Sequence, residues 1–241
     1  MQLKTVENYE EMSRLACSVI IQRIQQLDNP VLGLATGSTP EGLYKQMIEQ
    51  YKQKNVSFES VRTFNLDEYV GLTKEDEQSY DFYMKDNLFQ HIDIDQANTH
   101  LPNGVAADLE KECIDYEARI EQAGGIDVQV LGIGLNGHIG FNEPGTNFSS
   151  RTHIIDLAPS TRKANARFFE DLAEVPEKAI TMGIETIMQS KEILLLVSGE
   201  KKAEAVSRMI EGEISEEFPA SILQKHPNVT VIGDKATLSL L

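Results

Sequence analysis

Hydrophobic residues recur every three or four positions near the start of the chain and gather in short continuous runs further on. The apolar positions of residues 8–27 share one face of an amphipathic helix: Met12, Leu15, Ala16, Val19, Ile20, Ile24 and Leu27. The apolar run at 31–35 predicts a buried strand. Thr39 then predicts the N-cap, and Pro40 the first residue, of a helix that extends to about residue 53.

The rest of the chain alternates between apolar runs and amphipathic stretches. The apolar runs predict strands at 58–66, 126–133, 152–157, 179–183, 193–198 and 229–232. The stretches between them predict helices at 79–89, 105–123, 160–169 and 201–211. Alternating strands and helices imply βαβ crossovers, and therefore a mostly parallel sheet with helices on both faces. No repeat or Pro/Ser-rich linker interrupts the chain, so we expect one α/β domain over residues 1–241.

Composition narrows the class of partner. The 38 acidic residues outnumber the 22 Lys and Arg, and the net charge of −16 disfavours binding to nucleic acid or to an anionic membrane surface. An anionic small molecule would need a local positive site. Cys17 and Cys113 lie far apart and form no metal-binding pattern, which is typical of a reducing compartment. With no signal peptide and no long apolar run, we expect a cytoplasmic protein.

The glycine-rich stretch 130–144, VLGIGLNGHIGFNEP, follows a predicted strand and contains three candidate functional residues. Asn136, His138 and Glu143 could form an acid/base group, because a carboxylate beside a histidine orients the ring and favours its charged form. The alternative is a glycine-rich turn in which the histidine only hydrogen-bonds to the backbone. A metal site is disfavoured, since no further His or Cys stands at a suitable spacing.

A second candidate is the loop Thr36-Gly37-Ser38-Thr39, which joins a predicted strand to a predicted helix. Backbone N–H groups at such a position, together with the positive end of the helix, suit a phosphate. The loop matches neither G-x-G-x-x-G nor the P-loop pattern, so the sequence does not indicate a nucleotide site. An ordinary N-capped turn is the alternative.

Charged residues at other predicted strand ends complete the set. Asp67 and Glu68 are adjacent, so their side chains point to opposite sides of an extended chain and at most one should face a pocket. A solvated acidic turn is the alternative. Arg162, Arg167 and Lys202 are candidate phosphate ligands. Together with the two loops, these residues indicate proton transfer on a small phosphorylated, hydroxylated substrate, with no metal or cofactor.

Five motifs resemble the glucosamine-6-phosphate deaminase family: LATGSTP at 34–40, FNLDEYVGL at 64–72, GIGLNGHIGFNEPGT at 132–146, SRTH at 150–153 and TRKANARFF at 161–169. The resemblance covers essentially the whole chain and is greatest to the short bacterial form. It implies a Rossmann-like sheet and the conversion of glucosamine 6-phosphate and water to fructose 6-phosphate and ammonia, as in amino-sugar catabolism. It implies no cofactor.

The resemblance also implies residue roles. Asp67 would be the base that moves the C2 proton to C1, and His138 would open the sugar ring with Glu143 as its carboxylate partner. Asn136 stands where other members carry aspartate, and an amide cannot stabilise an imidazolium as a charge would. The substrate phosphate would lie against residues 36–39, and the charges of Arg167 and Lys202 would bind it: the loop residues are Thr36, Gly37, Ser38 and Thr39.

The segment after SRT bears on regulation. Allosteric members of the family bind an acetylated sugar phosphate there through basic residues, whereas this chain has His153 and Ile155. We therefore expect no activation by N-acetylglucosamine 6-phosphate, and a homo-oligomer is left open.

Two other functions remain as alternatives. A 6-phosphogluconolactonase-like hydrolase is one, although that family typically has Asp-Glu-Arg where this chain has Asp67, Glu68 and Tyr69, and it lacks the Asn-Glu-Pro ending of the glycine-rich stretch. The other is a non-catalytic domain that senses a sugar phosphate. Such an effector domain would need a helix-turn-helix segment, for which the length and acidity leave no room.

Overall fold

The computed structural model describes residues 1–166, 169 and 171–241. Seven strands form one sheet in the order β1-β10-β9-β6-β2-β3-β5, and every neighbouring pair is parallel. These strands are β1 (Gln2–Val6), β2 (Val31–Leu34), β3 (Arg62–Asn65), β5 (Thr99–His100), β6 (Val128–Leu131), β9 (Glu192–Val197) and β10 (Val229–Asp234). The predicted α/β, mostly parallel, Rossmann-like fold is therefore confirmed.

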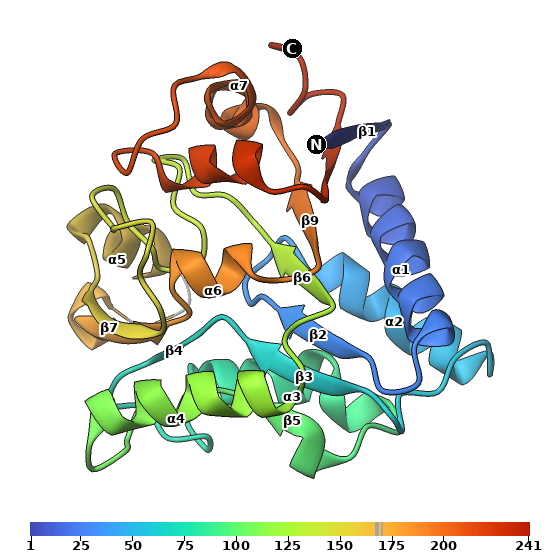
Figure 1. Cartoon of the computed structure of the whole chain (residues 1–241), viewed down its shortest axis with the longest axis vertical. Coiled ribbons are helices and arrows are strands. Elements are labelled where there is room, and N and C mark those ends of the chain that lie inside the picture. Colours follow the sequence, from blue (N-terminus) through green and yellow to red (C-terminus); the bar gives the residue numbers. More distant parts are fainter. Residues whose placement is uncertain (167–168, 170) are drawn as a thin grey trace.

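Helices cover both faces of this sheet (Figure 1). The α-helices are α1 (Tyr9–Gln26), α2 (Glu41–Lys52), α3 (Tyr80–Asn87), α4 (Leu109–Gln122), α5 (Pro159–Asn165), α6 (Ile184–Met188) and α7 (Ala203–Glu211). Buried side chains of α1, α2 and α3 pack on one face, and those of α4, α6 and α7 pack on the other. Side chains cap several of these helices: Asn8 Oδ1 accepts a hydrogen bond from the Glu11 amide at 3.0 Å.

The alternation of side chains along the strands explains the two cores. Leu32 and Leu34 of β2 pack with α1 and α2, whereas Val31 of the same strand packs with α4 and α6. Central strands buried on both faces carry continuous apolar runs, as the sequence of β9 does.

The strand order reverses between β2 and β6. From β2 the chain proceeds outward through β3 to β5, whereas β6, β9 and β10 lie on the other side of β2. In an open α/β sheet the crevice at such a reversal, beyond the carboxyl ends of the strands, is where ligands bind. The loops that follow β2 and β6 are the phosphate-loop candidate 36–39 and the glycine-rich stretch, so the topology brings them together.

A second, three-stranded sheet stands beside the first. It has the order β4-β8-β7 and is antiparallel, with β4 (Asp67–Tyr69) paired to β8 (Lys178–Thr181) and β8 paired to β7 (His153–Asp156). Figure 1 shows β7 near α5, to the left of the main sheet. The strands predicted at 152–157 and 179–183 therefore exist but belong to this second sheet. Its β4 carries Asp67.

Several predicted boundaries are wrong. The strand predicted at 58–66 begins only at Arg62, because Phe58 is buried in a turn in which its carbonyl accepts a hydrogen bond from the Val61 amide at 2.9 Å. Helix α2 begins at Glu41, and Pro40 rather than Thr39 holds the cap position without a side-chain cap. The apolar character of Phe58 and Val61 reflects burial rather than an extended backbone.

Other boundaries differ for local reasons. Helix α4 begins at Leu109 instead of residue 105, since the Asp108 carboxylate accepts a hydrogen bond from the Lys111 amide at 2.9 Å. Helix α5 ends at Asn165, short of the predicted residue 169, although residues 167, 168 and 170 lie outside the described part of the chain. The hydrophobic pattern of the sequence did not predict β1, β4, β5 or α6.

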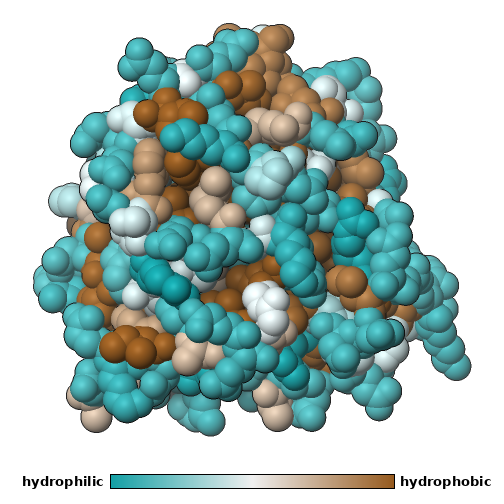
Figure 2. All heavy atoms as spheres, in the orientation of Figure 1, coloured by the Kyte–Doolittle hydropathy of each residue, from teal (hydrophilic) through white to brown (hydrophobic). Residues whose placement is uncertain are grey.

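Hydrophilic residues cover most of the face shown in Figure 2, and hydrophobic residues appear between them in small groups. Within the described ranges, no helix has the length and apolarity that crossing a membrane requires.

Candidate active site

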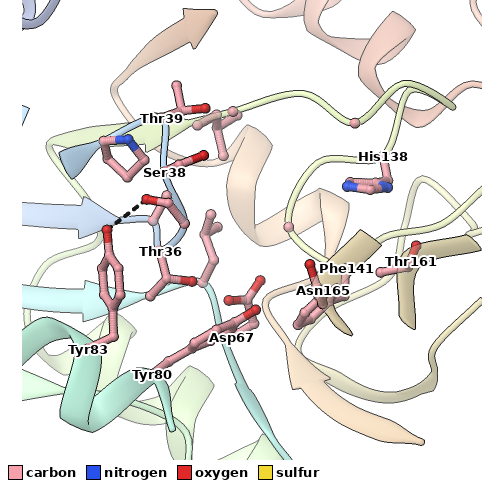
Figure 3. Close-up of a pocket in the computed structure, with 18 of the residues that line it drawn as sticks. Thr36, Ser38, Thr39, Asp67, Tyr80, Tyr83, His138, Phe141, Thr161 and Asn165 are labelled. Carbon is pink, nitrogen blue, oxygen red and sulfur yellow. Dashed lines mark hydrogen bonds between the residues drawn. The ribbon is translucent and has the colours of Figure 1, made fainter. Parts of the chain in front are cut away.

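A cavity of about 720 Å³ opens at the carboxyl ends of β2 and β6. Figure 3 shows Thr36, Ser38 and Thr39 on one side of it and His138 on the other, with the Asp67 carboxylate between them. The residues of both sequence candidates that line it are Thr36, Gly37, Ser38, Thr39, Asp67, Asn136, His138 and Lys202. Four segments that are far apart in the sequence therefore converge on one site.

Two tyrosine hydroxyls hold the loop 36–39 by hydrogen bonds to its backbone carbonyls. Tyr83 donates to the Gly37 carbonyl at 2.7 Å (Figure 3), and Tyr9 donates to the Ser38 carbonyl at 3.0 Å. Gly37 has a φ of +99°, which an L side chain rarely adopts. Within the described residues the amides of Gly37 and Thr39 donate no hydrogen bond to the protein, so these N–H groups can serve an anion.

The three basic residues predicted to bind phosphate lie in different places. Lys202 lines the cavity, and its Nζ donates to the Ile133 carbonyl at 2.6 Å, where β6 leads into the glycine-rich stretch. Arg162 instead donates to the Val175 carbonyl at 2.7 Å and does not line the cavity. Arg167 lies outside the described residues. The structure thus places one of the three cations at the site.

Asp67 and Glu68 point in opposite directions from β4. Glu68 is buried and accepts hydrogen bonds from the amides of Tyr69, Tyr80 and Asp81 at 2.8 to 2.9 Å, which satisfies the first turn of α3. The Asp67 carboxylate faces the cavity and, among the described residues, receives no hydrogen bond. The Glu68 carboxylate therefore caps a helix, and the Asp67 carboxylate is the one that faces the cavity.

Burial changes the proton affinity of both carboxyls. Loss of hydration, with the neighbouring charge of Glu68 as a second cause, raises the pKa of Asp67 to about 8. Burial also raises the pKa of Glu68 to about 7, although the amide hydrogen bonds oppose this change. A carboxyl whose pKa lies near neutrality can both accept and return a proton, as a proton shuttle requires.

His138 lies against the backbone of its own loop. A Cβ added to Gly134 would come within 2.4 Å of His138 Cε1, so only glycine allows the imidazole to occupy this place. The loop is closed by two backbone bonds, from Gly134 N to His138 O at 2.9 Å and from Gly137 N to Gly134 O at 3.0 Å. The glycines predicted to shape a pocket thus fix the histidine.

Glu143 lies beside His138, as the sequence predicted. His138 Nδ1 lies 3.6 Å from Glu143 Oε2, the distance of an ion pair rather than of a hydrogen bond. Asn136 does not touch the imidazole: its Nδ2 donates to Glu143 Oε2 at 2.7 Å, and its Oδ1 accepts from the His138 backbone amide at 3.3 Å. The amide therefore orients the carboxylate rather than the ring.

Helix α5 brings two residues to this site that the sequence did not predict. Thr161 Oγ1 donates a hydrogen bond to Glu143 Oε1, and Asn165 Nδ2 donates to the Tyr69 hydroxyl at 2.9 Å. Burial would raise the pKa of Glu143, but interactions with His138, Thr161 and Asn136 outweigh it and lower this pKa. The four-residue spacing of Thr161 and Asn165 in the motif TRKANARFF was the available signal, because it places both on one helix face.

In the described part of the chain, no group of three or more His, Cys, Asp or Glu side chains is arranged to hold a metal ion. What the site offers is an anion loop, a buried carboxylate and a histidine, all lining one cavity, with Glu143 paired to that histidine.

Known proteins of one family resemble this chain over most of its length. The family model described as glucosamine-6-phosphate isomerases/6-phosphogluconolactonase matches residues 5–232. The chain belongs to this family. A glucosamine-6-phosphate deaminase of Oceanobacillus iheyensis is 63% identical over 238 residues, which cover 99% of this chain and 95% of the relative. Glucosamine-6-phosphate deaminase 1 of Bacillus subtilis is 52% identical and covers 100% of this chain and 99% of its own length.

Solved structures of the family separate into two groups. A monomeric glucosamine-6-phosphate deaminase superposes with a TM-score of 0.98 at 52% identity and covers 100% of both chains. The 6-phosphogluconolactonase from Trypanosoma cruzi has a TM-score of 0.81 at 20% identity and covers 100% of this chain and 96% of its own. The second likeness shows the shared fold alone.

Proposed function

We propose that this protein is a glucosamine-6-phosphate deaminase in which Asp67 is the central base. The observation that carries the proposal is the buried Asp67 carboxylate, which faces the cavity between the loop 36–39 and the pair of His138 and Glu143. The reaction converts glucosamine 6-phosphate and water to fructose 6-phosphate and ammonia, and the relatives at 52% to 63% identity carry this name.

Ring opening is the first step that the site supports. The pyranose hydroxyl at C1 gives up its proton while the ring oxygen gains one, and the C1–O5 bond breaks to leave an aldehyde. His138 is the group for this exchange: its Nδ1 faces Glu143, which leaves Nε2 for the sugar. The negative charge of Glu143 stabilises the imidazolium that forms during the transfer.

Proton transfer from C2 to C1 follows. The aldehyde acidifies the C2 proton, and Asp67 removes it while O1 takes up a proton from the ammonium at C2, which forms an enolamine. The same carboxyl returns its proton to C1 and leaves an iminium at C2. Water then adds at C2 and ammonia leaves, which produces the ketone. The raised pKa of Asp67, to about 8, suits this double role, because it stabilises the protonated intermediate form of the carboxyl.

Phosphate binding would position the sugar. The amides of Gly37 and Thr39 and the ammonium of Lys202 would bind the phosphate, since these residues line the same cavity as His138, and Figure 3 shows Thr39 across from His138. Each charge-assisted bond contributes roughly 1.5–3 kcal/mol, and this energy holds the reacting carbon next to the base. Arg167, which the structure does not describe, completes the set that we propose.

The deciding experiment is an ammonia-release assay. The purified protein is supplied with glucosamine 6-phosphate, and ammonia and fructose 6-phosphate are measured together, while hydrolysis of 6-phosphogluconolactone is followed in parallel. We expect equal amounts of ammonia and ketose and no lactone hydrolysis above the spontaneous rate. Lactone hydrolysis without ammonia would support the hydrolase, and binding without either reaction would support the sensor.

The proposal extends to assembly and location. The monomeric state of the structurally similar deaminase supports a monomer for this single-domain chain of residues 1–241. Two further features stay predictions: a cytoplasmic location, and the absence of activation by N-acetylglucosamine 6-phosphate. In the segment SRTH at 150–153, the Arg151 guanidinium pairs with the carboxylates of Glu117 and Glu121 at 2.6 and 2.7 Å, so its charge is already matched within the protein.

A further inference from the structure

Helix α5 supplies a hydroxyl to the histidine–carboxylate pair. Thr161 is 6% exposed, and its Oγ1 donates to Glu143 Oε1. The other oxygen, Oε2, accepts from Asn136 at 2.7 Å and lies 3.6 Å from His138 Nδ1. Each oxygen of Glu143 therefore has its own donor, and the two donors come from different segments of the chain.

We propose that Thr161 is a positioning residue of the reaction, which holds Glu143 in the orientation and charge state that His138 needs. This inference rests on the proposed function, because it assigns a role within the same ring-opening pair. Thr161 acts through Glu143, and no contact of Thr161 with the substrate is required.

Geometry is the first reason. The terminal torsion of a glutamate is broad, so a carboxylate with a donor on one oxygen only can turn about its last bond. The bond from Thr161 to Oε1 fixes the carboxylate plane, and with it the direction in which Oε2 faces His138. Glu143 is only 7% exposed, so water has little access to replace a lost donor.

Charge is the second reason. The groups that face the Glu143 carboxylate are His138 and Asn136 from its own loop and Thr161 from α5. Among the described residues, no lysine or arginine pairs with Glu143. Two uncharged donors thus oppose the cost of burying this charge, and together with His138 they hold the pKa of Glu143 below its usual range.

Docking of the helix can be separated from this role. Asn165, one turn after Thr161, donates to the Tyr69 hydroxyl at 2.9 Å, and Tyr69 shares β4 with Asp67. Helix α5 therefore has a second polar contact with the site that does not involve Glu143. Loss of the Thr161 hydroxyl should leave that contact in place.

The test compares Thr161→Val with Thr161→Ser. Valine keeps the branched shape but lacks the hydroxyl, whereas serine keeps the hydroxyl. Thr186→Val is the matched control, because Thr186 also donates its hydroxyl to a buried carboxylate, that of Glu117, at 2.7 Å, away from the cavity. For each variant, kcat and KM for ammonia release, the Tm, and the pKa of Glu143 are measured. The pKa comes from carbon NMR of labelled glutamate, assigned with Glu143→Gln.

We expect Thr161→Val to raise the pKa of Glu143 and to lower kcat by roughly 10- to 100-fold, the effect of one hydrogen bond to a charged group, with KM nearly unchanged. Thr161→Ser should keep the pKa of Glu143 and kcat close to their wild-type values. A wild-type pKa of Glu143 in Thr161→Val, or a loss of kcat no greater than in Thr186→Val, would overturn the inference. If the wild-type protein releases no ammonia, the proposed function fails, but the NMR titration still decides the role of Thr161.

Discussion

The pH dependence of the reaction should depend on Glu68, a residue that does not face the cavity. Glu68 raises the pKa of Asp67 through its charge, in addition to the larger effect of burial. Glu68→Gln removes this charge and keeps the size of the side chain. We therefore expect the pKa of Asp67 to fall, and the acid limb of kcat/KM to move to lower pH.

The size of the effect follows from the titration of Asp67. With a pKa of about 8, only roughly one tenth of this carboxyl is ionised at pH 7 in the free protein. The gain in kcat/KM at pH 7 is therefore limited to about tenfold. The variant also loses stability, because Glu68 Oε2 accepts from the Asp81 amide at 2.9 Å and an amide nitrogen cannot. That loss should be about 1–3 kcal/mol.

The assay is a profile of kcat/KM for ammonia release between pH 5 and 10, within the range where each variant remains folded. Glu75→Gln is the matched control, since it makes the same change of charge at an exposed position. A wild-type profile with no acid limb above pH 5, as expected if Asp67 titrated like an ordinary carboxyl, would refute the reasoning. So would an acid limb that Glu68→Gln leaves in place.

Three other substitutions test separate parts of the site. Lys202→Ala should mainly raise KM, and an unchanged KM would remove this residue from the phosphate site. Gly134→Ala should lower kcat by about 100-fold, because the added Cβ would lie 2.4 Å from His138 Cε1. Gly132→Ala is the control: its Cβ meets no atom within 4 Å, so the histidine should stay in place and kcat should change little. Asp67→Asn should raise the free energy of unfolding in urea, increasingly from pH 5 to 8. Above about pH 4 the unfolded chain loses the Asp67 proton while the folded protein, with its raised pKa, keeps it, so the wild-type protein becomes less stable as the pH rises toward 8. A difference in stability between the variant and the wild-type protein that is the same at pH 5 and pH 8 would contradict this.

The main sheet could be predicted because its central strands are buried on both faces and carry continuous apolar runs. Strand β1 could not, because most of its residues are exposed and its pairing joins residue 2 to residue 230. Such a contact depends on the whole chain being folded. The antiparallel pairing of Asp67 with Thr181 is equally non-local, and no feature of either sequence segment specifies it.

The candidate site could be predicted as a set of segments but not as a geometry. Strand topology explains why the loop 36–39 and the glycine-rich stretch meet, since both follow strands at the point of reversal. Which of Asp67 and Glu68 faces the cavity was decided by α3, whose first amides bind Glu68. The donation from Thr161 to Glu143 depends on the docking of α5, which local sequence does not define.

The most direct test of the account is Asp67→Asn assayed for both binding and chemistry. Asparagine keeps the size and polarity of the side chain but cannot accept a proton from C2. Calorimetry with glucosamine 6-phosphate should show binding within a few-fold of the wild-type protein, while ammonia release should fall by at least about 100-fold, as for loss of a general base. Ammonia release near the wild-type rate would contradict the assignment of Asp67 as the base.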